Sequence, residues 1–157
     1  MKYLIGLDGS DLALDGLRHV LALARQGLDC ELVLANVQPG ANLYEVVVAH
    51  DPEVLAEVKA QAGQHALDAG AALCREAGLP CEQVLAEGEA APMLIDLTDD
   101  HGCEAIVLGA RGLGESGLSS FGRVAEGVLH RAHVPVTLVR RPPPEVEPSD
   151  LPPDDEV

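Results

Sequence analysis

A glycine-rich segment that follows a short apolar run could hold an anion through its backbone. Five glycines lie from Gly109 to Gly122, and a stretch of helical periodicity begins at 123. Glycine permits positive φ and close approach of a ligand, and the first amides of a helix have no intrahelical partner. Such amides can donate to a phosphate group. The segment therefore predicts either a phosphate-binding loop or a surface connection without a ligand.

Polar residues also close the first two apolar runs of the chain. Asp8, Gly9 and Ser10 follow the run that starts at Lys2, and a polar stretch at 36–40 follows the run that starts at Glu31. In a doubly wound parallel sheet, ligands bind beyond the carboxyl ends of the strands, where the strand order reverses. We therefore expect both stretches to lie beside the glycine-rich segment.

Short apolar runs alternate with longer stretches of helical periodicity, which predicts an α/β fold with a parallel sheet. The five predicted strands are Lys2 to Leu7, Glu31 to Val37, Cys81 to Ala86, Ala105 to Leu108 and Val134 to Arg140. The predicted helices cover about 11–26, 51–77, 91–100 and 123–131. The third strand is the most polar, so we place it at a sheet edge.

Local signals mark the ends of the first two helices. Ser10 or Asp11 is the expected N-cap of the first helix, and Gly78 is expected to end the second. Residues 42–50 include a Val46-Val47-Val48 run that suits a helix, an edge strand or a loop. That stretch is left without an assignment.

The composition indicates one globular domain with an acidic tail. The chain has 157 residues, 47% of them hydrophobic, and a formal net charge of −16. This charge disfavours nucleic acid and anionic membranes, and 2% aromatic residues with no Trp disfavour recognition by ring stacking. Residues 142–157 contain six acids and six prolines but no Lys or Arg. We therefore expect a domain over 1–141 and a disordered, Pro-rich tail over 142–157.

The cysteines and the apolar runs favour a cytoplasmic location. The four cysteines lie far apart without a C-x-x-C pair, so we interpret them as reduced core thiols. The first apolar run is too short for a secretory signal, and no run approaches the roughly 18 apolar residues of a membrane span.

Other groups of reactive residues do not form recognisable sites. They are a His/Cys set (His101, Cys103, His130, His133), an acidic pair (Asp99, Asp100) and three serines (Ser116, Ser119, Ser120). The His/Cys set lacks further ligands at metal-site spacing, and adjacent acids on a helix point in different directions. The serines have no evident base partner. We therefore expect no metal site built from protein ligands and no catalytic residue.

Two motif interpretations of the glycine-rich segment compete. Gly112, Gly114 and Gly117 match G-x-G-x-x-G, but only one strand follows and no acid closes it, which disfavours a dinucleotide site. The G-x-x-x-x-G-K-[ST] pattern of P-loop enzymes is absent from the sequence.

The second interpretation uses Gly109, Gly112 and Gly122, whose spacing resembles the G-x2-G-x9-G-[ST] loop of the universal stress protein family. Asp8-Gly9-Ser10, Gly88 and the closing Pro135-Val136 strand are also similar to that family, and the resemblance spans about residues 2–140. It implies a three-layer α/β/α sandwich with a five-stranded parallel, Rossmann-like sheet of order 3-2-1-4-5. It further implies a homodimer paired through the last strand, and ATP bound with Mg²⁺ or Mn²⁺ carried by the phosphates.

The resemblance implies a role for individual residues. Asp8 and the backbone at Val37 would hold adenine, Gly109 would lie by the ribose, and the residues around Gly112 and Gly122 would hold the phosphates. The expected nucleotide-binding residues are Leu7, Asp8, Ser10, Val37, Leu108, Gly109, Arg111, Gly112, Gly122, Arg123 and Val124. A solvated surface charge is the alternative for Arg111.

One position departs from the family pattern. Arg123 stands where the family has Ser or Thr after the third glycine, and it could hold phosphate through its forked donors or pair with Glu126 instead. Glu115 adds a negative charge to the loop.

Three functions follow from these observations. The first is a stress-response adaptor that binds an adenine nucleotide and signals as a dimer to an unidentified protein. The second is a dimeric interaction module that has lost the nucleotide, and the third is a slow ATPase, for which the sequence names no base. The apolar last strand, about 134–140, is expected to be an uncovered edge that pairs with a second copy.

Overall fold

The computed structural model describes residues 1–110 and 122–141, which form a five-stranded parallel sheet between two layers of helices. The strands are β1 (Lys2–Gly6), β2 (Glu31–Gln38), β3 (Cys81–Glu87), β4 (Ala105–Gly109) and β5 (Val136–Val139). The helices are α1 (Asp11–Arg25), α2 (Leu43–Val48), α3 (Pro52–Glu76), α4 (Ala90–Asp100) and α5 (Arg123–Arg131). The predicted tail, 142–157, lies outside the described residues.

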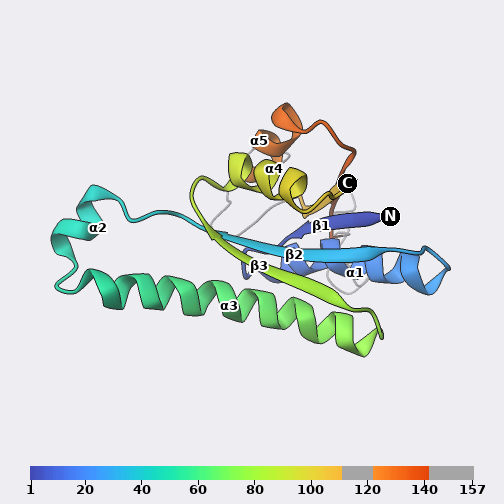
Figure 1. Ribbon diagram of the computed structural model, residues 1–157, viewed down its shortest axis with the longest axis horizontal. Helices are drawn as coiled ribbons and strands as arrows, with labels where there is room; N and C mark the ends of the chain where they lie inside the picture. The colour runs from blue at the N-terminus through green and yellow to red at the C-terminus, as the bar shows by residue number, and fades with distance from the viewer. Residues whose placement is uncertain (111–121, 142–157) are drawn as a thin grey trace, which may run out of the picture.

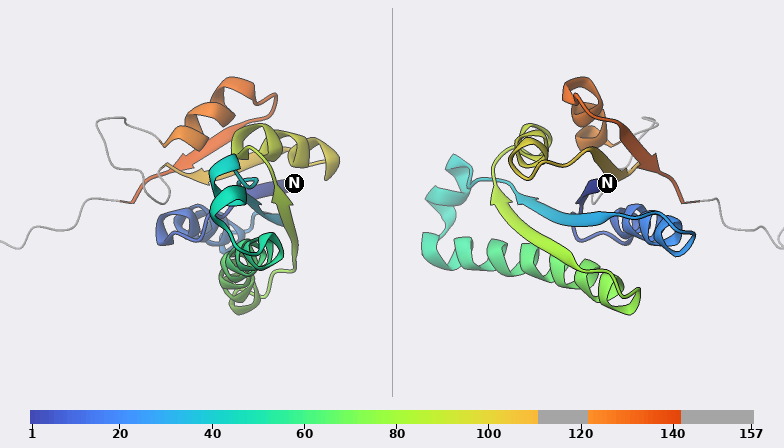
Figure 2. Two further views of the ribbon diagram at one scale, coloured as in Figure 1. Left: turned by 90° about the vertical axis from the view of Figure 1, so that its left-hand side faces the viewer. Right: turned by 45° about the vertical axis from the view of Figure 1, so that its right-hand side comes forward.

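The strand order is β3-β2-β1-β4-β5, which confirms the predicted fold and puts the polar third strand at an edge. Alternation within each central strand sends neighbouring side chains to opposite faces. Ile5, Leu34 and Val107 pack against α1 and α3, whereas Leu4, Val33 and Ile106 pack against α4 and α5. Figures 1 and 2 show these helix pairs on the two sides of the sheet. The nearly continuous apolar runs are thus explained by burial on both faces.

The helix ends follow the expected chemistry. Ser10 is the N-cap of α1, and its hydroxyl accepts a hydrogen bond from the amide of Ala13 at 3.1 Å. Gly78 follows α3 with φ of +71°, the left-handed conformation that glycine adopts most readily. The last strand is shorter than the predicted Val134 to Arg140. Pro135 has no amide to donate, and β4 provides partners only as far as Val139.

The unassigned stretch 42–50 contains a short helix, α2. The Val46-Val47-Val48 run forms its second half, and a capping box between Asn42 and Glu45 begins it. In the described part of the chain, no helix combines the length and apolar character of a membrane span.

Candidate functional site

A pocket opens at the carboxyl ends of β1 and β4, where the strand order reverses. The empty space in it, open solvent included, is about 650 Å³. The lining residues are Gly6, Leu7, Asp8, Ala13, Ala35, Val37, Ala90, Leu94, Leu108, Gly109, Ala110, Gly122, Val124 and Ala125. Among the described residues, the lining is therefore mostly apolar, with one acidic side chain at its border.

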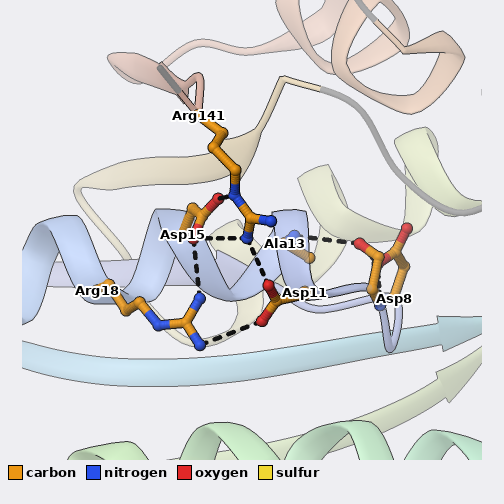
Figure 3. Close-up of polar contacts among 7 residues, drawn as sticks. Asp8, Asp11, Ala13, Asp15, Arg18 and Arg141 are labelled. Carbon is orange, nitrogen blue, oxygen red and sulfur yellow. Dashed lines mark hydrogen bonds and ion pairs between the residues drawn. The ribbon is translucent and has the colours of Figure 1, made fainter. Parts of the chain in front are cut away.

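The acidic side chain, Asp8, is held in place by the start of α1. Its Oδ1 accepts hydrogen bonds from the Ser10 amide at 2.9 Å and from the Ser10 hydroxyl at 2.6 Å. The same hydroxyl accepts from Ala13 and caps α1. Asp8, Ser10 and the first turn of α1 thus form one hydrogen-bonded unit, part of which is drawn in Figure 3.

A buried amide secures the other side of the turn after β1. Asn36 is 1% exposed, and its Nδ2 donates to the Leu7 carbonyl at 2.8 Å. Its Oδ1 accepts from Gln38 at 2.8 Å, so no polar atom of this side chain is left unsatisfied. Because Leu7 also donates its amide to Ala35 at 2.8 Å, the ends of β1 and β2 are fixed together. This arrangement gives Asp8 a rigid backbone.

Glycine allows α1 to pack closely on the end of β4. A Cβ on Gly109 would lie 2.6 Å from the carbonyl oxygen of Leu12 and 3.1 Å from the Cα of Ala13. From the other side, a Cβ on Gly16 would lie 3.3 Å from the Leu108 carbonyl carbon. Gly109 therefore has a structural reason to be glycine, besides the ribose contact that the resemblance implies.

The first turn of α5 forms another wall of the pocket. Gly122 is the N-cap of α5, and its amide donates to the Ala110 carbonyl at 2.7 Å. Its φ of −69° and ψ of 159° are open to any residue, so the backbone conformation does not require glycine here. Val124 and Ala125 border the same space. A helix N-terminus of this kind favours an anion through its amides and its dipole.

The structure brings most of the expected site residues together. Seven of them line the pocket: Leu7, Asp8, Val37, Leu108, Gly109, Gly122 and Val124. Ser10 supports Asp8 and caps α1 rather than lining this pocket. Arg123 is the first residue of α5 and is not among the lining residues. Arg111, Gly112 and the loop residues up to 121 lie outside the described part of the chain.

Sequence reasoning missed the small residues that make the space. Ala13, Ala35 and Ala125 line the pocket from α1, β2 and α5, and each is less than one-tenth exposed. An alanine in an apolar run or on a helix has the same pattern as any core residue. The only sequence signal is its position at the carboxyl end of a strand or in the first turns of a helix.

A four-residue charge cluster ties the end of the sheet to α1 (Figure 3). Arg141, two residues after β5, donates from Nε to Asp15 at 2.8 Å and from Nη2 to Asp11 at 2.5 Å. Arg18 donates to the same two carboxylates at 2.8 and 3.2 Å. The hydrogen bonds from Arg141, and then those from Arg18, lower the pKa of both Asp11 and Asp15. The cluster therefore stabilises the fold while both carboxylates are charged, at neutral pH. This stabilisation is lost as falling pH protonates the carboxylates.

The cysteines do not contribute reactive groups to the pocket. All four are free; Cys74 and Cys103 are buried, whereas Cys30 and Cys81 are half-buried. Burial raises the pKa of Cys74 to about 12, which keeps that thiol protonated and unreactive. Within residues 1–110 and 122–141, His, Cys, Asp and Glu side chains form no group of three that could hold a metal ion.

Comparison with known proteins agrees with this fold. The chain matches the model of the universal stress protein family over residues 1–140. It is 28% identical to the universal stress protein MJ0531 of Methanocaldococcus jannaschii, over 92% of this chain and 84% of that protein. It is 30% identical to the universal stress protein YxiE of Bacillus subtilis, over 88% and 98%. The chain therefore belongs to the universal stress protein family.

Solved structures share the architecture at lower identity. The protein MJ0577 superposes with a TM-score of 0.77 at 21% identity, covering 90% of this chain and 96% of that one. A universal stress protein in complex with cAMP gives 0.66 at 21% identity, over 88% and 96%. A family protein from Arabidopsis thaliana with AMP bound gives 0.67 at 18% identity, over 98% and 97%. These relatives confirm the fold, and two of them hold adenine nucleotides.

Proposed function

We propose that this protein binds ATP or a related adenine nucleotide in the pocket and acts in the cytoplasm as a nucleotide-dependent, dimeric adaptor of the stress response. The observation that carries the proposal is the pocket at the strand-order reversal, bordered by Asp8 and by the first turn of α5. The AMP and cAMP complexes of two relatives support an adenine nucleotide as the ligand.

The pocket suits the two ends of such a ligand. The apolar walls from Val37 and Leu94 would take the base, and a carboxylate oxygen of Asp8 would accept from its exocyclic amine. The amides of the first turn of α5 would donate to the phosphates. A divalent ion would be held mainly by phosphate oxygens, because the described residues contain no group of three His, Cys, Asp or Glu side chains that could hold it.

The first test is calorimetric titration of nucleotide-stripped protein with Mg-ATP, which we expect to give saturable binding and a raised melting temperature. Asp8→Asn should weaken binding about tenfold, the cost of one charge-assisted hydrogen bond. Asn keeps the Oδ1 acceptor for Ser10 and replaces the other oxygen with an amide nitrogen, so α1 stays capped.

Asp99→Asn is the matched control, because it removes one carboxylate from the exposed end of α4. It should bind Mg-ATP like the wild type. No heat and no thermal stabilisation at millimolar Mg-ATP would contradict the proposal.

The second candidate is a dimeric interaction module without nucleotide, and Arg123 is the residue that favours it. This long side chain begins α5 where the family has a small hydroxyl residue. Arg123→Ser separates the two functions. A gain of Mg-ATP binding in the variant, with none in the wild type, would favour the second candidate. Weaker binding would identify Arg123 as a phosphate ligand.

Dimerisation is expected along β5, which is an edge strand of the sheet. The carbonyls of Pro135 and Val139 accept hydrogen bonds from Ile106 in β4 and from Ala110 just after it, so the alternation along the strand turns the backbone groups of Val136 away from β4. Light scattering should give twice the 16.4 kDa of one chain. Val136→Pro removes the outward donor and should give a monomer, whereas Val136→Ala keeps the donor and should stay dimeric. A dimeric Val136→Pro variant would place the interface elsewhere.

A further inference from the structure

The strongest unexplained feature lies outside the pocket, in the segment from 42 to 59, here named the apolar arm. It contains α2 and the first two turns of α3. Seven large apolar side chains on it are about half or more exposed: Leu43, Tyr44, Val46, Val47, Val48, Val54 and Val58. Leu43 is 80% exposed and Val47 is 74% exposed, and α2 has no buried residue. Exposed apolar patches of this kind mark interaction sites.

Within the apolar arm, α2 has no buried residue and is held to α3 and to the end of β2 by polar contacts. Lys59 Nζ donates to Glu45 at 2.9 Å and to the Pro39 carbonyl at 3.2 Å, and its side chain is 18% exposed. Asn42 and Glu45 cap the start of α2 reciprocally at 2.8 and 3.1 Å. In an ordinary surface helix the apolar side faces the protein and the polar side faces water. In α2 this arrangement is reversed, so the apolar side chains are presented outward on a preformed helix.

The position of the arm leaves it accessible in a dimer. Figure 1 shows α2 beyond the carboxyl end of β2, at the far end of the molecule. The right-hand view of Figure 2 shows α2 and the last strand on opposite sides. Pairing along β5 would therefore leave the apolar arm uncovered. Only residues 39–41 separate the end of β2, whose Val37 lines the pocket, from the cap of α2.

Charge selects among the occupants that could cover the arm. The segment 42–59 carries four carboxylates and one lysine, a net charge of −3, and the whole chain carries −16. Asp51, Glu53 and Glu57 are all exposed beside the apolar side chains. A second copy would bring two such acidic arms together, and an anionic bilayer would be repelled. A cationic surface complements the arm in both charge and polarity.

We propose that the apolar arm docks a cationic amphipathic segment of another protein, with apolar residues on one face and Lys or Arg on the other. Its apolar face would cover Leu43, Tyr44 and Val47, and its cations would meet the exposed carboxylates of α3. This docking role rests on the proposed adaptor function and specifies the chemistry of the protein that the adaptor would bind. Its test does not use nucleotide, so failure here leaves Mg-ATP binding untouched and the converse also holds.

The probe is a labelled designed helical peptide with leucines on one face and lysines on the other, titrated with full-length protein and followed by fluorescence anisotropy. A second peptide has every lysine replaced by glutamate. We expect the lysine peptide to bind and the glutamate peptide to bind at least about tenfold more weakly. The double variant Leu43→Ser, Val47→Ser should weaken lysine-peptide binding about tenfold, because both anchors lie one turn apart on α2.

Matched variants separate docking on the arm from general attraction to an acidic protein. Leu129→Ser removes a 44% exposed apolar side chain on α5 and should bind the lysine peptide like the wild type. The double variant Glu53→Gln, Glu57→Gln should weaken binding of the lysine peptide. The control double variant Asp99→Asn, Asp100→Asn removes the same charge at the exposed end of α4 and should bind the lysine peptide like the wild type. Circular dichroism checks that each variant folds.

Several outcomes would overturn the proposal. Equal binding of the two peptides, or equal loss in the arm and control variants, would show only unspecific attraction. Self-association abolished by Leu43→Ser, Val47→Ser would assign the arm to a second copy. Binding to anionic phospholipid vesicles, lost in the same variant, would assign it to a membrane surface.

Discussion

The Gly109→Ala variant is expected to lose roughly 2 kcal/mol of its free energy of unfolding and to melt about 4–8 °C lower than the wild type. The added Cβ would lie 2.6 Å from the Leu12 carbonyl oxygen, a distance that real Cβ atoms do not show. The obstacle is backbone, so no side-chain rotation relieves it, and α1 would have to move away from β4. Thermal unfolding followed by circular dichroism measures the effect.

Gly40→Ala is the matched control for this prediction. The nearest atom to a Cβ at Gly40 is a carboxylate oxygen of Glu87 at 3.7 Å, an ordinary contact. This substitution should leave the melting temperature unchanged or raise it slightly, because alanine restricts the unfolded chain. If Gly109→Ala were as stable as Gly40→Ala, close packing of α1 on β4 would not be the structural reason for Gly109.

The sheet could be predicted from sequence because each strand is defined by local information. The runs that contain Leu4-Ile5, Val33-Leu34 and Ile106-Val107 are apolar at consecutive positions, which only burial on both faces explains. The third run is the most polar of the five, which predicts an edge position, and the residues of β3 are exposed or half-buried in the structure. The strand order came from the family resemblance, since crossover rules alone permit several orders.

The α2 segment could not be assigned because its local and tertiary signals disagree. Val46-Val47-Val48 has strand propensity, and no buried stripe indicates a helix. The helix is stabilised instead by the Asn42–Glu45 capping box and by Lys59, which is 14 residues from Glu45 in the sequence. A capping pattern is visible in sequence, but the contact with Lys59 exists only after α3 folds back along the body.

The candidate site shows the same division between local and long-range information. The Asp8–Ser10 unit and the cap of α1 span few residues, and the first helix was predicted to begin there. The contacts of Arg141 with Asp11 and Asp15 join residues 130 and 126 positions apart. Arg141 is one of two adjacent arginines before the acidic tail, and no spacing rule identifies its partners. Such ion pairs follow from the topology, which brings the end of β5 beside α1.

The Gly122→Val variant should fold normally and bind Mg-ATP at least about a hundredfold more weakly than the wild type. Close packing of α1 on β4 accounts for glycine at position 109, whereas a bound ligand is the proposed cause at position 122. The φ of −69° and ψ of 159° at Gly122 suit valine, so the backbone itself is not strained by the change. Gly122 lines the pocket with Val124 and Ala125, where the phosphates are proposed to meet the amides of α5, so we expect a valine here to compete with them for space. Two lost charge-assisted hydrogen bonds, about 3 kcal/mol, account for the expected factor.

The design separates loss of the ligand site from loss of the fold. Valine is a poorer N-cap than glycine, so α5 should lose no more than about 1 kcal/mol, measured as a small fall in melting temperature without nucleotide. Gly40→Val, outside the lining of the pocket, should bind Mg-ATP like the wild type. Wild-type affinity in Gly122→Val would show that the phosphates do not lie at the start of α5, even if calorimetry confirms binding. Loss of affinity with the fold retained would show that Gly122 is glycine because a ligand approaches its backbone.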